Sequence, residues 1–224
     1  MSPSWIVEPH RVFITGGTGY IGLPLIALLL KGGHDVSALV RKGSEKKLPA
    51  GCRPVLGNAL DSNSYAAQIT PADTFIQLVG VSHPNPSKAA EFRNVDLVSG
   101  QNAINAALAA GVRHFIYVSV AQPAPVMKAY IQVRADCEKV ISQSGMDATI
   151  FRPWYVLGPG HRWPYVLIPL YKLMELLPQT RDGATRLGLV TLGQMSKALL
   201  RAVESRTQGV RIVGVPEIRA AGGF

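Results

Sequence analysis

The 224-residue sequence has little cysteine and no long apolar run. Its two cysteines, Cys52 and Cys137, lie far apart and form no Cys-x-x-Cys pair, so neither a disulfide framework nor a metal site is indicated. The longest apolar segment, residues 21–30, is too short to span a bilayer. Residues 1–10 lack a basic region followed by an apolar one. We therefore expect a cytoplasmic protein that is neither exported nor inserted into a membrane.

Acidic residues are also scarce. Fourteen Asp and Glu stand against 23 Lys and Arg, which gives a formal net charge of +9. A basic protein can bind nucleic acid or an anionic membrane, but here the basic residues are scattered and no run of them reaches five. No aromatic-and-basic surface motif accompanies them. A nucleic-acid binder is the least favoured class, and a small anionic ligand would account for part of the charge.

The sequence does contain a regular alternation of strand and helix patterns. The predicted strands are residues 11–15, 35–40, 53–56, 74–79, 114–118 and 148–151, and the predicted helices are 20–31, 61–68, 88–110 and 126–144. Strands that alternate with helices are typical of a parallel sheet covered on both faces. We expect an α/β protein with a doubly wound, Rossmann-type sheet.

After Gly160 the alternation loosens. Residues 163–177 and 191–204 have helical patterns and 210–213 a short strand pattern. We expect a single domain, with a Rossmann core over residues 1–160 and a small C-terminal cap over residues 161–224. The cap would lie over the carboxyl edge of the sheet, where open α/β folds bind ligands. The apolar stretch 163–177 is either a lid for an apolar substrate or plain packing.

Three glycines follow the first predicted strand at a Gly-x-x-Gly-x-x-Gly spacing. Gly16 would permit a tight turn, Gly19 would let the backbone approach a pyrophosphate, and Gly22 would let the helix pack closely on the strand. The helix N-terminus supplies N–H groups to phosphates. The pattern predicts a dinucleotide site, and a tight turn without a ligand is the alternative. The predicted contacts are Gly16, Thr18, Gly19, Tyr20, Ile21 and Gly22.

The second predicted strand ends in the basic pair Arg41-Lys42. An NAD-preferring site usually has a carboxylate there, about 20 residues beyond the glycine turn, to bind the ribose 2′-hydroxyl. Asp35 lies at the other end of that strand. A 2′-phosphate would therefore meet two cations, which favours NADP(H) over NAD. The alternative is that Arg41 and Lys42 only begin a solvated loop.

Several motifs together resemble the atypical and extended short-chain dehydrogenase/reductase families, especially the NmrA-like NAD(P)H-binding branch. The matching stretches are residues 12–22, Val40-Arg41, residues 115–119, Phe151-Arg152-Pro153 and residues 158–160. The resemblance covers about the first 160 residues.

The resemblance implies a serine at the end of the fifth strand and a Tyr-x-x-x-Lys pair on the next helix, which act in carbonyl reduction by hydride transfer. Ser119 and Tyr130 fit, but Arg134 stands at the lysine position. A fixed positive charge would help Tyr130 to give up its proton, although arginine cannot relay one. The alternatives are a packing role for Tyr130 and a surface salt bridge between Arg134 and Glu138.

The resemblance also implies further cofactor contacts: adenine near Asn58 and Ala59, the adenosine ribose near Val79 and Gly80, and the nicotinamide near Pro153. The family usually has Gly-Asp where this chain has Gly57-Asn58.

Other polar residues could face the substrate. His83 and the pair His161-Arg162 are candidates, but solvated loop positions are the favoured interpretation for them.

Two functions remain open at this point. One is an NADP(H)-dependent reductase or epimerase-like enzyme for a small carbonyl or sugar-derived substrate. The other is a cofactor-binding module without turnover, similar to NmrA or to the dinucleotide-binding accessory subunit of respiratory complex I, which the missing lysine favours. A homodimer through residues 88–110 and 126–144 would follow the analogy of the fold.

Overall fold

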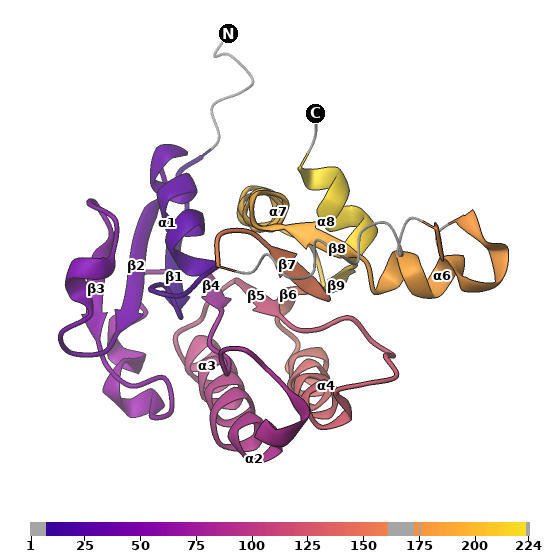
Figure 1. Cartoon of the computed structure of the whole chain (residues 1–224). Coiled ribbons are helices and arrows are strands. Elements are labelled where there is room, and N and C mark those ends of the chain that lie inside the picture. Colours follow the sequence, from indigo (N-terminus) through magenta and orange to yellow (C-terminus); the bar gives the residue numbers. More distant parts are fainter. Residues whose placement is uncertain (1–7, 161–172, 175, 223–224) are drawn as a thin grey trace, which may run out of the picture.

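A computed structural model describes residues 8–160, 173–174 and 176–222 of the chain. Its centre is a parallel sheet of seven strands with helices on both faces (Figure 1). The strands of this sheet are β1 (Arg11–Thr15), β2 (Asp35–Val40), β3 (Arg53–Leu56), β4 (Thr74–Gln77), β5 (His114–Val118), β6 (Asp147–Phe151) and β9 (Val210–Val213). This confirms the doubly wound Rossmann-type fold.

The strand order β3-β2-β1-β4-β5-β6-β9 determines where a ligand can bind. From β1 the chain moves outward to β2 and β3, and it then returns to place β4 on the other side of β1. The loops after β1 and β4 therefore leave the sheet in opposite directions. In open α/β sheets ligands bind in the crevice that this reversal opens at the carboxyl ends of the strands.

Both faces of the sheet are buried, and alternate residues of each strand supply the two cores. In β1, Val12 and Ile14 belong to one apolar cluster, whereas Phe13 belongs to the other. The first face is covered by α1 (Gly22–Lys31), α7 (Leu192–Glu204) and α8 (Val215–Ala221) (Figure 1). The second is covered by α3 (Val98–Ala109) and α4 (Lys128–Gln143).

Residues 88–110 are helical as predicted, but they do not form one regular α-helix. The segment consists of a 3-10 turn at Pro86–Lys88, α2 (Ala89–Glu91), a π-helical segment at Phe92–Leu97, and α3. π-Helical turns occur often at functional sites, because the wider turn re-aims the side chains around it.

The helix predicted over residues 61–68 is wrong, since the structure has two 3-10 turns at Ser62–Ser64 and Ala66–Gln68. Local side-chain bonds compete with a regular helix here. The Asp61 carboxylate accepts a hydrogen bond from the Asn63 N–H at 3.1 Å. The Ser64 hydroxyl donates to the Asp61 carbonyl at 2.7 Å.

The C-terminal third contributes to the sheet itself as well as to the region beside it. β9 pairs with β6 as the last strand, and α7 packs on α1. A second, two-stranded parallel sheet is formed by β7 (Tyr155–Leu157) and β8 (Leu189–Thr191). Neither this sheet nor α6 (Pro178–Arg186) was predicted from the sequence. The predicted segment 163–177, with His161 and Arg162, lies almost entirely outside the described residues.

Candidate cofactor and active site

The glycine turn lies directly after β1, at the reversal of the strand order. Gly16 has a φ of +74°, and a Cβ there would lie 2.8 Å from the carbonyl carbon of Leu78, beyond the end of β4. A Cβ at Gly22 would lie 2.5 Å from the Gly16 carbonyl oxygen. Packing therefore requires both glycines, one for the turn and one for the close approach of α1.

Gly19 differs from the other two glycines, because a Cβ there would meet only the Gly16 carbonyl oxygen, at 3.1 Å. Gly19 is exposed, and its N–H donates to the same oxygen at 3.0 Å. The space outside Gly19 is thus open to a ligand. The N-terminal N–H groups of α1 follow immediately, so the turn offers the donors and the partial positive charge that a pyrophosphate requires.

The two residues that precede Gly22 face inward. Ile21, the residue before α1, packs against the apolar core of the first face. Tyr20 is half-buried, and its hydroxyl lies against the backbone of Gly158, next to β7. Thr18 lies between Gly17 and Gly19 and is half-buried.

The basic pair at the end of β2 is exposed. Arg41 and Lys42 follow Val40 directly, and neither side chain forms an ion pair or a hydrogen bond with another described residue. At the end of the neighbouring strand β3, the Asn58 side chain accepts a hydrogen bond from the Leu60 N–H at 3.0 Å, and Ala59 packs against the core. These strand ends share one edge of the sheet with the glycine turn.

Ser119, immediately after β5, is only 3% exposed and donates its hydroxyl hydrogen to Glu138 Oε1 at 2.5 Å. Glu138 lies on α4 and forms an ion pair with Arg152, which follows β6. Gln122 also donates to Glu138, at 3.0 Å. Because its hydrogen is committed to Glu138, Ser119 offers only oxygen lone pairs to a substrate in this arrangement.

Arg134 is buried on α4, with 5% of its surface exposed. Its guanidinium forms an ion pair with Asp96 of the π-helical segment and donates to the Val118 carbonyl at 2.9 Å. A Cβ at Gly80 would overlap this guanidinium, so Gly80 and the Arg134–Asp96 pair are packed together. The surface salt bridge considered between Arg134 and Glu138 is wrong, because Arg134 pairs with the buried Asp96 and Glu138 pairs with the half-buried Arg152.

Burial disfavours the charged forms of both Asp96 and Arg134. Burial raises the pKa of Asp96, whereas Arg134 and the Val81 N–H act in the other direction. Burial also disfavours the charged form of Arg134, but Tyr130, Tyr117 and Asp96 hold its pKa well above the ordinary value. A buried guanidinium and a buried carboxylate thus depend on each other.

Tyr130 lies in the first part of α4, above this pair. Its ring packs on Phe92 at a centroid distance of 4.9 Å and on the Arg134 guanidinium at 5.1 Å. The structure therefore brings Tyr130 and Arg134 together, and it binds Ser119 to a different group, Glu138. The ring packs on Phe92 and is also next to a cation, so both interpretations of Tyr130 stay predictions.

A buried polar chain connects the turn to Asp96, and the sequence analysis did not identify it. Thr15 at the end of β1 bonds Gln77 at the end of β4, and Gln77 donates to Ser99 at 3.2 Å. Ser99 in turn donates to the Asp96 carbonyl at 3.3 Å. The only signal in the sequence was the presence of polar residues at the ends of apolar strands.

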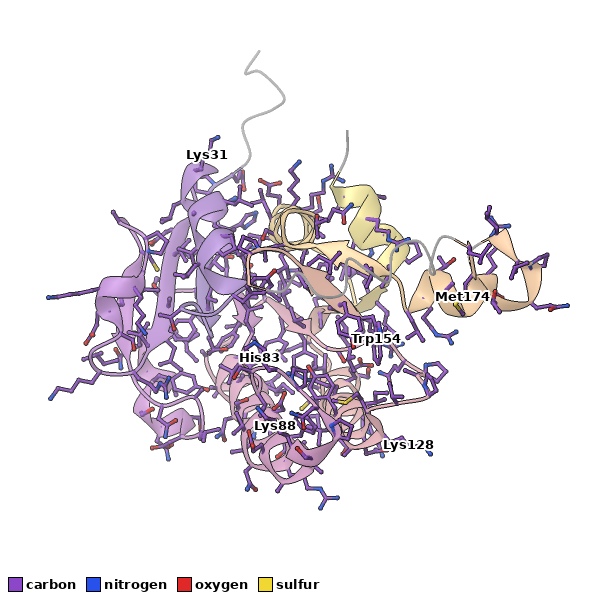
Figure 2. All side chains as sticks on the ribbon, in the orientation of Figure 1. Lys31, His83, Lys88, Lys128, Trp154 and Met174 are labelled. Carbon is purple, nitrogen blue, oxygen red and sulfur yellow. The ribbon has the colours of Figure 1, made fainter. Side chains whose placement is uncertain are left out.

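The ends of β5, β6 and β9 open onto a pocket of about 490 Å³. Its lining includes Gln122, Arg152 and Val215 from the sheet side and Arg181 and Arg186 from α6. Pro153, predicted at the nicotinamide, is buried beside it, and its carbonyl accepts from Ala121 at 2.9 Å. Figure 2 labels Trp154, the residue after Pro153, and Met174, which lies beside α6.

His83 lies on the exposed loop after β4, and its φ of +50° places it in the left-handed region. Figure 2 shows it just above Lys88. In the described part of the chain, no group of three or more His, Cys, Asp or Glu side chains could hold a metal ion. No described helix has the length and apolar character of a membrane span.

Comparison with known proteins identifies the family. A family model described as NAD(P)H-binding matches residues 16–166, from the first glycine of the turn to beyond β7. The chain belongs to this NAD(P)H-binding family. The match confirms the resemblance to the atypical short-chain dehydrogenase/reductase superfamily.

Individual relatives are more distant. The chain is 27% identical over 226 residues to a 3-diazoavenalumate denitrifying reductase of Streptomyces sp, covering 89% of this chain and 74% of that protein. It is 31% identical over 153 residues to an uncharacterized sugar epimerase, YhfK, of Bacillus subtilis, covering 64% and 71%. The Bordetella bronchiseptica enzyme WbmH in complex with NAD+ has the same fold, with a TM-score of 0.70 at 22% identity over 92% of this chain and 76% of that one.

Proposed function

We propose that this NAD(P)H-binding protein is an NADP(H)-dependent reductase or epimerase-like enzyme for a small carbonyl or sugar-derived substrate. One observation carries the proposal: the open side of Gly19 lies beside a helix N-terminus, on the same edge of the sheet as the exposed pair Arg41-Lys42. The names of two relatives, a reductase and a sugar epimerase, support the reaction class.

The residues at this edge fit a dinucleotide with a 2′-phosphate. Besides the glycine turn, Arg41 and Lys42 would bind the 2′-phosphate, because they are exposed, cationic and not paired with a described carboxylate. The remaining proposed contacts are Asn58 and Ala59 with adenine, Val79 and Gly80 with the adenosine ribose, and Pro153 with the nicotinamide. The nicotinamide, when bound, supplies or accepts a hydride.

Tyr130 is the group that we propose as the proton donor to a substrate oxygen. The Arg134 guanidinium lies 5.1 Å from the centroid of its ring, so a positive charge is next to the proposed donor. Arg134 itself is held by Asp96 and the Val118 carbonyl, so it acts as a positioning residue and keeps its proton. Ser119, held by Glu138, would accept a hydrogen bond from a substrate hydroxyl.

A cofactor-binding protein without turnover is the second candidate function. The observation that favours it is the burial of Arg134, whose two Nη groups donate to Asp96, the Val118 carbonyl and the Tyr117 hydroxyl. A lysine at this position in related enzymes would keep its ammonium available to the cofactor ribose and to the proton. The NmrA-like branch and a homodimer through α3 and α4 stay predictions.

A binding titration followed by a reaction panel tests the proposal. NADPH should bind more tightly than NADH, and the saturated protein should oxidise NADPH with at least one member of a panel of aldehydes, ketones and keto sugars. Tyr130→Phe keeps the ring that packs on Phe92, so it should abolish turnover while NADPH binding persists.

Three results test the two candidates and the role of Tyr130. Bound NADPH without any turnover, also in Arg134→Lys, would favour the second candidate. Turnover that survives Tyr130→Phe would remove Tyr130 from the mechanism. A protein that binds neither cofactor would contradict both candidates.

A further inference from the structure

The pocket beyond β5, β6 and β9 lies on the same edge of the sheet as the glycine turn but at the other end of it. It is therefore separate from the glycine turn and from Arg41-Lys42, and it adjoins Pro153, the proposed nicotinamide contact. One wall contains Arg152, which the Glu138 ion pair holds in place, and the same Glu138 accepts from Ser119. The pocket thus borders the proposed reaction centre.

Part of the sheet side of the pocket is apolar, next to Gln122 and Arg152. Ala121, Ile212, Val215 and Pro216 line it there. A volume of about 490 Å³ is typical of a site for a small organic molecule. A ligand with an apolar body would bury that body against these four side chains.

The side formed by α6 has a different chemistry, because Arg181 and Arg186 both line the pocket from this helix. The Nε–H of Arg186 donates to the Pro123 carbonyl at 3.2 Å, which anchors the side chain and leaves its two Nη groups for other partners. Arg181 forms no ion pair or side-chain hydrogen bond with another described residue.

The charges around the pocket do not cancel. Its lining has three guanidinium groups, those of Arg152, Arg181 and Arg186, against the single carboxylate of Asp182. Glu138 already neutralises Arg152. The two arginines of α6 therefore exceed their counter-charge, and both are exposed at the pocket, where a bound anion would form charge-assisted hydrogen bonds with them.

We infer that this pocket binds the substrate as an organic anion, with its carboxylate or phosphate at Arg181 and Arg186 and its apolar body against Val215 and its neighbours. Arginine suits this role because its planar fork matches the oxygens of both groups. The inference rests on the proposed function, since it names the substrate class of that site. Part of the net charge of +9 would then serve to bind an anionic substrate at this pocket.

Three compounds with one apolar body test the inference: 3-phenylpropionate, 3-phenylpropyl phosphate and the neutral 3-phenylpropionamide. Each is titrated calorimetrically into the NADPH-saturated protein and into the free protein. At least one anion should bind about tenfold or more tightly than the amide, which corresponds to about 1.4 kcal/mol. The preferred anion identifies a carboxylate or a phosphate as the natural head group.

Two variants assign the effect to α6. The double variant Arg181→Gln, Arg186→Gln should bind the preferred anion no more tightly than the amide, while its NADPH affinity is unchanged. The matched control is Arg11→Gln, because Arg11 is exposed at the amino end of β1, on the opposite edge of the sheet. This control should keep the preference for the anion.

The outcomes separate the inference from the proposed function. Equal binding of all three compounds, no measurable binding of either anion, or a preference that survives the double variant would overturn the inference. NADPH binding and carbonyl reduction could still hold in each case. Conversely, a free protein that selects the anion through Arg181 and Arg186 but binds no NADPH would support the pocket and contradict the proposed function.

Discussion

Replacing Arg134 with methionine should lower the free energy of unfolding by about 3–5 kcal/mol. The reason is the partner that this substitution leaves behind. Asp96 has no exposed surface, and its remaining described partner at Oδ2 is the Val81 N–H, at 3.1 Å. A buried carboxylate without a cation is either charged at a high desolvation cost or protonated, and both states are less stable than the ion pair.

A double-mutant cycle measures the pair itself. Asp96→Asn keeps an acceptor for the Val81 N–H but removes the charge, so alone it leaves the Arg134 guanidinium without a counter-ion. The combined variant has no buried charge at either position. Its loss in free energy of unfolding should therefore be smaller than the sum of the two single losses by about 2 kcal/mol.

Urea denaturation at neutral pH, followed by circular dichroism and tryptophan fluorescence, gives the four free energies. Additive single effects would contradict the buried ion pair, and a loss below about 1 kcal/mol in Arg134→Met would show that Asp96 finds another partner. Arg134→Lys is a useful fourth variant, because it keeps the charge and loses the guanidinium fork. It should fall between the wild type and Arg134→Met.

Three further predictions follow from the cofactor edge and the sheet. Arg41→Asp should reduce the preference for NADPH over NADH by about tenfold or more in fluorescence titrations, whereas an unchanged ratio would exclude Arg41 as a 2′-phosphate contact. Gly19→Ala should weaken NADPH binding and leave thermal stability nearly intact, whereas Gly22→Ala should lower the melting temperature, because its Cβ would lie 2.5 Å from a backbone oxygen. Burial lowers the pKa of His114 from 6.5 to about 4, so the unfolded chain binds more protons between these values and stability should fall as the pH falls through this range, by up to about 3 kcal/mol. Urea denaturation of the wild type and of His114→Gln at several pH values in that range checks this prediction. If the free energies of unfolding of the two proteins change with pH in parallel, the prediction is contradicted.

The sequence was sufficient for the features that local chemistry determines. Each main-sheet strand up to β6 has an apolar run of its own, and the glycines at 16, 19 and 22 identify the turn because their spacing is local. The helix predicted over residues 61–68 was wrong because of hydrogen bonds that the apolar pattern does not show. Apolar spacing alone cannot reveal that Asp61 and Ser64 will bond to nearby backbone groups.

Ion pairs between residues far apart in the chain could not be predicted from local sequence patterns. Asp96 meets Arg134 across 38 positions, and Arg152 meets Glu138 from the next strand, so neither pair has a helical spacing. The i, i+4 rule instead suggested Arg134 with Glu138, and both residues lie on α4, but each pairs with a residue from another element, Asp96 and Arg152. A three-residue strand such as β7 likewise forms only because β8 lies beside it.

The arginine at position 134 is explained by what surrounds it. The π-helical segment turns Asp96 inward, Gly80 leaves room for a planar guanidinium, and the Val118 carbonyl accepts a second bond from the same fork. An ammonium group on a flexible stem could pair with Asp96, but it could not reproduce this planar set of donors. The residue type therefore follows from the burial of Asp96, whatever Tyr130 does. It also follows that activity lost in an Arg134 variant is evidence on catalysis only when it exceeds the loss of folded protein measured in the same sample.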